Sequence, residues 1–188
     1  MKKRIALIAK DLFSQKGYLG TSIEEIVEAA ESSKGNLYYH FKSKEGLFLH
    51  LLVEQVDEWL VQWSVKENHY RTATEKLYGL AEHVADDLRN PLMKAADEFR
   101  SSVAADPAVA EQIKIAVRRQ REIFHSVIQE ALEEEEIGGY DREQLAMILY
   151  ALIAGLGTVR HERRLEEITS LHHTAISIFL HGTANAKS

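Results

Sequence analysis

The sequence predicts an all-α protein of about nine helices, and three observations lead to that fold class. Apolar residues recur at the i, i+3, i+4 spacing along the whole chain, which is the period of an amphipathic helix. Alternation with a period of two, the mark of a half-buried strand, does not persist anywhere. The chain has only 2 prolines among 188 residues, and the expected breaks carry glycine, proline or a capping residue.

Four helices are expected in the N-terminal part of the chain. The first runs over 2–16 and ends at Gly17. Thr21 and Ser22 can both cap the second, because each is followed three residues later by a glutamate, as a capping box requires. The remaining boundaries are caps at Ser32 and Ser33 for a short third helix to about His40, and a cap at Ser43 for a long fourth helix to about Glu67.

Five further helices are expected after these, each opened by a capping residue or by proline in the first turn. The fifth begins at Thr72 or Thr74 and ends near Asn90, the sixth begins at Pro91 with Phe99 and Val103 on its apolar side, and the seventh runs from Asp106-Pro107 through Glu133–Glu136. After a break at Gly138-Gly139, the eighth runs from Asp141 to about Val159, and the ninth covers about Glu162–Leu180 and ends at Gly182.

Charge is distributed unevenly along the chain. Residues 1–50 hold 8 of the 23 Lys and Arg and 6 of the 29 Asp and Glu, so this segment carries +2 and the remainder −8. A small basic head on an acidic body suits a protein that touches DNA at one end only. Because the chain has no cysteine, disulfides and cysteine zinc sites are excluded, and no apolar run approaches a membrane span.

The segment from Glu31 to Lys44 places hydroxyls, amines and an imidazole on a tight turn and a short helix. Such groups donate hydrogen bonds to phosphate oxygens and base edges. With the helix before it, the segment fits a helix-turn-helix, in which the second helix enters the major groove. Caps, aromatic residues and helix lengths agree with this interpretation, which we prefer to a solvated charged loop.

Separate roles are expected for the residues of this segment. Lys34 is expected to reach a guanine edge or a phosphate, and Gly35 to let the backbone approach the groove. Tyr38 and Tyr39 point about 100° apart on a helix, so one is expected to pack inward and the other, Tyr39, to face DNA, while Phe41 joins the core. The residues expected to contact DNA are Thr21, Ser32, Ser33, Lys34, Gly35, Asn36, Tyr38, Tyr39, His40, Lys42 and Lys44.

The run containing Thr21, Ile26 and Ala29, followed by residues 35–44, resembles the signature of the TetR family of bacterial one-component repressors. The similarity is greatest to members that repress multidrug efflux pumps, and it extends to Trp59, Trp63, Tyr78, Pro91 and Glu98-Phe99. The resemblance implies an all-α homodimer. Residues 1–45 would form the helix-turn-helix domain that grips an inverted-repeat DNA operator, and residues 46–188 the ligand-binding and dimerisation domain. A small lipophilic inducer would release a repressed efflux or detoxification gene through movement of the fourth helix.

The resemblance further implies ligand contacts at Trp59, Trp63, Asp86, Asp87, Arg89, Met93, Gln120 and Phe124. Where drug-binding members of the family carry acidic residues on the fourth helix, this chain has Gln55 and Val56. Two inducer classes therefore stay open: a lipophilic cation held through Trp59, and an uncharged or anionic lipophile near Arg89, which would suit a regulator of lipid or other metabolism with a fatty-acyl inducer. Trp59 and Trp63 also fit a purely structural role in the core.

The eighth and ninth helices are expected to form the dimer interface, because they combine small residues with an apolar stripe, although one intramolecular core would explain the same pattern. The stripe is Leu145, Leu149, Leu152 and Leu156 on the eighth helix and Ile168, Leu171, Ala175, Ile178 and Phe179 on the ninth. No nucleophile–base pair, phosphate loop or converging metal ligands are visible, so no enzyme activity, metal or cofactor is expected. The protein is expected in the cytoplasm, without a membrane partner.

Overall fold

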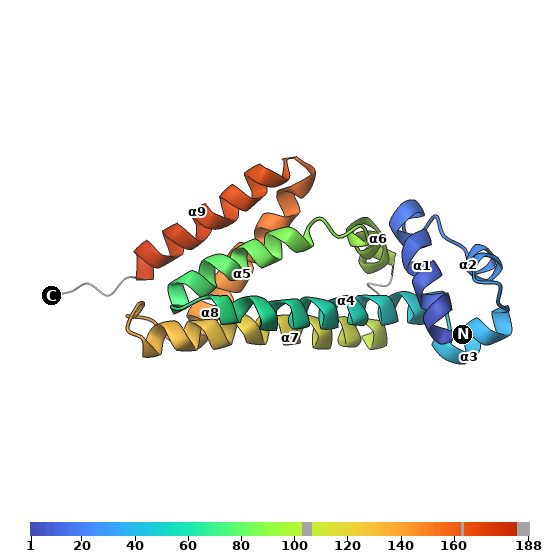
Figure 1. Ribbon diagram of the computed structural model, residues 1–188, viewed down its shortest axis with the longest axis horizontal. Coiled ribbons are helices and arrows are strands. Elements are labelled where there is room, and N and C mark those ends of the chain that lie inside the picture. The colour runs from blue at the N-terminus through green and yellow to red at the C-terminus, as the bar shows by residue number, and fades with distance from the viewer. Residues whose placement is uncertain (103–106, 163, 184–188) are drawn as a thin grey trace. The chain divides into compact units, whose positions relative to one another are not determined.

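The structure, a computed structural model, describes residues 1–102, 107–162 and 164–183, and in these residues it contains nine α-helices and no strand (Figure 1). The helices are α1 Lys2–Lys16, α2 Ile23–Ala29, α3 Lys34–Phe41, α4 Lys44–Lys66, α5 Ala73–Asp87, α6 Met93–Ser102, α7 Pro107–Glu133, α8 Arg142–Leu156 and α9 Leu165–Thr183. Short 3-10 segments follow α4 at Glu67–His69 and α8 at Gly157–His161. The predicted all-α fold class is confirmed.

Side-chain caps explain where four of these helices begin. Ser22 and Glu25 form the predicted capping box at α2, in which each side chain accepts a hydrogen bond from the other residue's backbone N–H. Ser33 caps α3, Thr72 caps α5 and Asp141 caps α8, each through a side-chain oxygen that accepts from the N–H three residues later. These contacts are local in sequence, which is why the sequence predicts them.

Two helix ends differ from the prediction because of hydrogen bonds made outside the helix itself. Pro91 lies before α6 instead of in its first turn, because Asn90 forms a turn whose side-chain and backbone oxygens accept from the N–H groups of Leu92 and Met93, both at 3.0 Å. α9 continues through Gly182 to Thr183, whose carbonyl accepts from Gly138 N–H at 2.9 Å. The expected positions Val103 and Asp106 lie outside the described residues.

Two further helices end earlier than expected. α5 ends at Asp87, before Asn90, and α8 ends at Leu156, where the chain tightens into a 3-10 segment instead of continuing as α-helix to Val159. No helix in the described part of the chain is long and apolar enough to cross a membrane.

The chain forms two compact units. The first contains residues 1–58 and 90–117, and the second contains 59–89 and 118–188, so α4 and α7 each contribute residues to both. The predicted boundary between functional domains after residue 45 stays a prediction. The division into compact units differs from it, because residues 46–58 and 90–117 belong to the same unit as the N-terminal helices.

Each unit has an aromatic centre. In the first, Phe48 lies 4.9 Å from Phe13 and 4.8 Å from Phe99 between ring centroids, and Tyr18 lies 5.0 Å from Phe99. Helices α1, α4 and α6 therefore meet in one core. The second unit is built on the packing of α5 against α9 and on a cluster that includes the fully buried Trp63.

Candidate nucleic-acid interface

A tight turn joins α2 to α3. Glu31 adopts a left-handed backbone conformation, with φ 45°, and Ser32 N–H donates to Val27 O at 2.8 Å, which satisfies a carbonyl at the end of α2. Ser33 Oγ then accepts from Asn36 N–H at 3.2 Å and starts α3. The result is a helix-turn-helix in which the cap at Ser33 fixes the start of the second helix.

Helix α3 has one buried side and one exposed side. Leu37 and Phe41 are buried in the core of the first unit, as predicted for Phe41. Tyr39 is 74% exposed, but Tyr38 is also 44% exposed, so the expectation that one tyrosine packs inward is wrong. Leu37 takes that place in the core, because the buried positions of α3 are four residues apart and leave both tyrosines on the solvent side.

Lys34, which is predicted to reach a guanine edge or a phosphate, is engaged in the free protein by an ion pair with Glu24 of α2. The hydrogen bond between them lowers the pKa of Glu24 and raises the pKa of Lys34. A second pair holds the same helix, since the hydrogen bond from Lys16, followed by those from Ser22, lowers the pKa of Glu25 to about 2. A DNA contact by Lys34 would therefore have to compete with Glu24 for the ammonium, and nothing in the sequence pattern indicated this ion pair.

The hydroxyls of Thr21 and Ser32 lie in buried positions that change the DNA contacts predicted for them. Thr21 is 1% exposed, and its hydroxyl donates to Gly17 O at 2.8 Å, so a DNA contact through this side chain is wrong: it fastens the turn after α1 instead. Ser32 does not cap α3, and its Oγ is buried without a hydrogen-bond partner in the described part of the chain. A phosphate contact by Ser32 stays a prediction.

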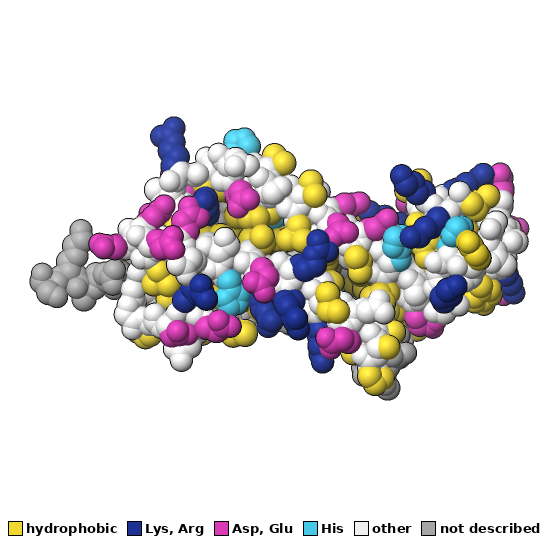
Figure 2. All heavy atoms as spheres, turned by 90° about the horizontal axis from the view of Figure 1, so that it is seen from below, with side chains coloured by type: hydrophobic (Ala, Val, Ile, Leu, Met, Phe, Trp, Pro, Cys, Tyr) yellow, Lys and Arg dark blue, Asp and Glu magenta, His cyan; other side chains and the backbone are white. Residues whose placement is uncertain are grey.

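The other predicted DNA residues lie on or next to α3. Lys42 ends the helix with φ 68°, and its ammonium donates to Tyr39 O at 3.3 Å. His40 is half-buried beside Tyr39, whereas the Lys44 ammonium lies 4.3 Å above the Tyr18 ring. Figure 2 shows Lys and Arg side chains gathered with histidines on the surface of the N-terminal helices, at the right of the view. This is the basic surface that a DNA backbone requires.

The fold and this helix-turn-helix can be compared with known proteins. Residues 8–51 match the family described as bacterial regulatory proteins, tetR family, and residues 55–185 match the family described as QacR-like protein, C-terminal region. The chain belongs to the TetR family. It is therefore a ligand-responsive transcriptional regulator that binds DNA and is not an enzyme, in agreement with the sequence prediction.

Individual proteins are similar to this TetR-family chain over nearly its whole length. It is 32% identical over 183 residues to the HTH-type transcriptional regulator QacR of Staphylococcus aureus, with 97% of each chain covered. A putative TetR-family regulator from Mesorhizobium loti has the same fold, with a TM-score of 0.80, 21% identity and coverage of 97% and 96%. FadR from Bacillus subtilis, solved with stearoyl-CoA, has a TM-score of 0.74, 16% identity and coverage of 97% and 99%.

The structure brings three of the expected ligand residues together in the second unit. Trp59, Trp63 and Phe124 belong to one apolar cluster and are at most 4% exposed. The rings of Trp59 and Trp63 lie 4.5 and 5.8 Å from the ring of His83, whose Nε2–H donates to Trp59 O at 3.0 Å. His83 was not predicted, although its sequence position among apolar residues of α5 gave a weak signal of burial.

The remaining expected ligand residues lie outside this apolar cluster. Asp86 pairs with Lys66 at 3.4 Å, and Lys66 Nζ also lies 3.3 Å from Nδ1 of His83. Burial lowers the pKa of His83, so the neutral ring accepts this hydrogen bond. Asp86 is thus connected to Trp59 through two side chains. The others outside the cluster are Asp87, Arg89 and Gln120 in the second unit and Met93 in the first.

Glu98 of α6, to which the family resemblance extends, contacts the turn after α1. Its carboxylate accepts from Leu19 N–H at 2.9 Å in the turn after α1, next to Gly17. The neighbouring Phe99 packs on Tyr18 and Phe48. The turn that precedes α2 is therefore held by α6 as well as by α1.

No group of three potential metal ligands occurs among the described residues.

Replacing Lys34 with alanine is expected to weaken operator binding by about 5- to 150-fold, the usual range for one lost base contact. Glu24→Gln is expected to act in the opposite direction, because it releases Lys34 and removes an acidic group next to DNA. Fluorescence anisotropy with a labelled operator measures both effects. Lys114→Ala, on an exposed part of α7, is the matched control. Unchanged affinity in Lys34→Ala would remove Lys34 from the interface.

Proposed function

We propose that this TetR-family chain is a cytoplasmic repressor of an efflux or detoxification gene, which binds an inverted-repeat operator as a dimer and leaves it when a lipophilic molecule binds. The observation that carries the proposal is the match to QacR over 97% of both chains, which includes the QacR-like C-terminal region. DNA would be contacted by the exposed side of α3, where Lys34, Tyr38 and Tyr39 are all exposed.

The inducer is proposed to act on the apolar cluster of the second unit. Trp59 and Phe124 supply aromatic surface there, and the network from Asp86 through Lys66 to His83 supplies the polar groups. A lipophilic cation would use the Trp59 face and the Asp86 carboxylate. Because these rings are buried in the free protein, the inducer must displace packed side chains, and this couples binding to a change of shape.

A second candidate function is regulation of lipid or other metabolism by an uncharged or anionic acyl compound. Gln55 and Val56 on α4 favour it, because the carboxylates expected there for binding a cation are missing. FadR, which shares the fold, was solved with stearoyl-CoA. A cationic and an anionic lipophile of equal chain length, compared as inducers, distinguish the two functions.

Helices α8 and α9 are the proposed dimer surface. The predicted stripe is divided: Leu145, Leu149, Ile168, Ala175 and Phe179 are buried in the second unit itself, so their assignment to an intersubunit stripe is wrong. Apolar residues remain on the outer sides of both helices, namely Met147, Ile148, Leu152, Leu171 and Ile178, each at least 36% exposed. Exposed small residues on α8, such as Gly155, allow close approach of a second helix.

The double substitution Ile148→Glu and Ile178→Glu is expected to convert a dimer into a monomer. Both side chains are more than half exposed, so charge there disrupts association without disturbing the core. Sedimentation equilibrium measures the change in mass. Ile115→Glu on α7, also at an exposed isoleucine, should leave the dimer intact. A double variant that stays dimeric would place the interface on another surface.

Selection of genomic DNA fragments with the purified protein tests the function. A discrete palindrome, released in a mobility-shift assay by a lipophilic cation, is the expected result. Release only by acyl anions would support the second candidate. Salt-sensitive binding without sequence preference would contradict both, because it would reduce the helix-turn-helix to a general phosphate contact.

A further inference from the structure

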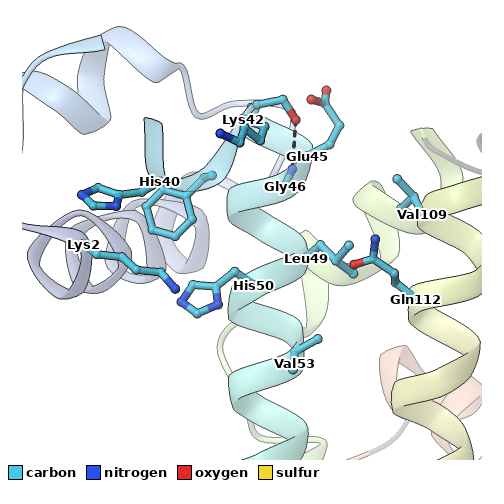
Figure 3. Close-up of a pocket in the computed structure, with 12 residues that line it drawn as sticks. Lys2, His40, Lys42, Glu45, Gly46, Leu49, His50, Val53, Val109 and Gln112 are labelled. Carbon is cyan, nitrogen blue, oxygen red and sulfur yellow. Dashed lines mark hydrogen bonds between the residues drawn. The ribbon is translucent and has the colours of Figure 1, made fainter. Parts of the chain in front are cut away.

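A hollow of about 580 Å³ lies next to the recognition helix, entirely within the first unit (Figure 3). Its walls come from the start of α1, the end of α3, the first half of α4 and the start of α7. This volume is in the range of small-molecule sites, which are about 300–1,000 Å³. None of the residues expected to bind the inducer lines it, so it is a separate site.

One side of the hollow is polar and cationic. Lys2 of α1 and His50 of α4 point toward one another across it, with His40 of α3 close by (Figure 3). The Lys2 ammonium lies 5.7 Å from the centre of the Phe41 ring, and no carboxylate pairs with it among the described residues. This ammonium therefore has donor capacity to spare.

Charged groups of both signs lie around His50. Burial, the largest effect, lowers the pKa of His50, and the Lys2 charge acts in the same direction against the opposing effect of Glu54, which lies 3.4 Å away. Glu45 also lines the hollow, but its carboxylate accepts from Tyr18 O–H at 3.2 Å. Lys42 lines the hollow as well, so two ammonium groups face the single Glu45 carboxylate and the lining keeps a net positive charge, to which the neutral imidazole adds polar surface.

The opposite side of the hollow is aliphatic. Leu49 and Val53 of α4 lie across from Val109 of α7, and Gln112 of α7 points toward Leu49 at the edge (Figure 3). Apolar walls of this kind bind the hydrocarbon part of a ligand, while a few polar groups fix its orientation. A cation at one end and aliphatic side chains at the other match a molecule with an anionic head and a short hydrocarbon tail.

We propose that this hollow binds a small amphipathic carboxylate, with its head at Lys2 and His50 and its tail along Leu49, Val53 and Val109. Its occupant touches α3 directly, unlike an inducer in the second unit. The bound anion offsets the Lys2 charge, so the DNA-facing surface becomes less positive and attracts the phosphate backbone less. Occupancy therefore lowers operator affinity from within the first unit, in addition to the inducer response proposed above.

Isothermal titration calorimetry of the full chain with sodium octanoate, below its micelle concentration, tests the site. Saturable binding at one site per chain is expected, with octan-1-ol binding much more weakly. Lys2→Gln is expected to weaken octanoate binding about tenfold, the usual effect of losing a charged hydrogen bond. Lys3→Gln, an exposed neighbour outside the hollow, is the matched control. Equal binding of octanol and octanoate would overturn the anionic assignment.

Gln112→Trp locates the site without changing charge. This exposed residue stands at the edge of the hollow, so an indole there fills the space and should abolish octanoate binding while preserving operator affinity. Octanoate binding that survives in Gln112→Trp, or that is absent from the wild-type chain, would overturn the proposal. If both variants instead weaken DNA binding and octanoate never binds, the hollow belongs to the DNA interface, and the repressor function stands without it.

Discussion

Trp63→Ala is expected to destabilise the second unit by about 3–5 kcal/mol, the usual cost of removing a large aromatic side chain from a core. Trp63 is fully buried. Its ring stacks at 6.1 Å on Tyr70 and at 5.8 Å on His83, so the substitution removes contacts to α5 and to the segment that leads into it. Gly79 of α5 leaves the space that the Tyr70 ring occupies, so Tyr70 can pack on Trp63.

Trp63→Phe provides the matched comparison. Trp63 Nε1 is buried without a hydrogen-bond partner in the described part of the chain, so phenylalanine loses volume but no hydrogen bond. It also removes a desolvated N–H, which is itself costly to bury. We therefore expect Trp63→Phe to lose less than half of the stability that Trp63→Ala loses. Urea unfolding followed by circular dichroism at 222 nm measures both free energies.

This comparison decides a question that the sequence leaves open, whether Trp63 belongs to the core or to a ligand site. A loss below about 1 kcal/mol in Trp63→Ala, together with a lost inducer response, would contradict the structural role. Unfolding at a lower urea concentration with an unchanged response in the folded fraction is the expected result. Trp59, which is only slightly more exposed, would then be the better candidate for ligand contact.

Local signals in the sequence predicted the helices well. Gly17 ends α1 at the expected residue, and Ser22, Thr72 and Asp141 cap helices as their spacing indicated. These features depend on hydrogen bonds within four residues, so the sequence contains all the information needed. The same holds for the helix-turn-helix, whose family signature is continuous in sequence.

Burial was harder to predict, because it depends on helices far apart in the chain. Leu149 is expected in a dimer stripe, yet it is fully buried in the second unit, and Thr21 is expected to contact DNA, yet it is only 1% exposed. An apolar stripe shows that a helix face is covered but does not identify what covers it. The ion pair between Lys34 and Glu24 was missed for the same reason, since it joins two helices.

Gly17→Ala is expected to destabilise the first unit by about 2–4 kcal/mol for two separable reasons. Gly17 has φ 79° and ψ 172°, a region that only glycine adopts readily, and a side chain there costs about 1–3 kcal/mol. In addition, a Cβ at Gly17 would lie 2.6 Å from the Glu98 carboxylate oxygens. Glu98 must then move, and its hydrogen bond from Leu19 N–H is strained or lost.

A double-mutant cycle separates these two contributions. In a Glu98→Ala background the steric conflict is gone, so Gly17→Ala should cost less than it does in the wild-type chain, by about 1 kcal/mol. Gly139→Ala is the matched control for the backbone alone, because Gly139 has φ 81° and no atom near its Cβ position. The residual cost of Gly17→Ala in the Glu98→Ala background should approach the cost of Gly139→Ala. Equal costs in the two Glu98 backgrounds would show that the carboxylate moves freely and that α6 does not fix the turn before the helix-turn-helix.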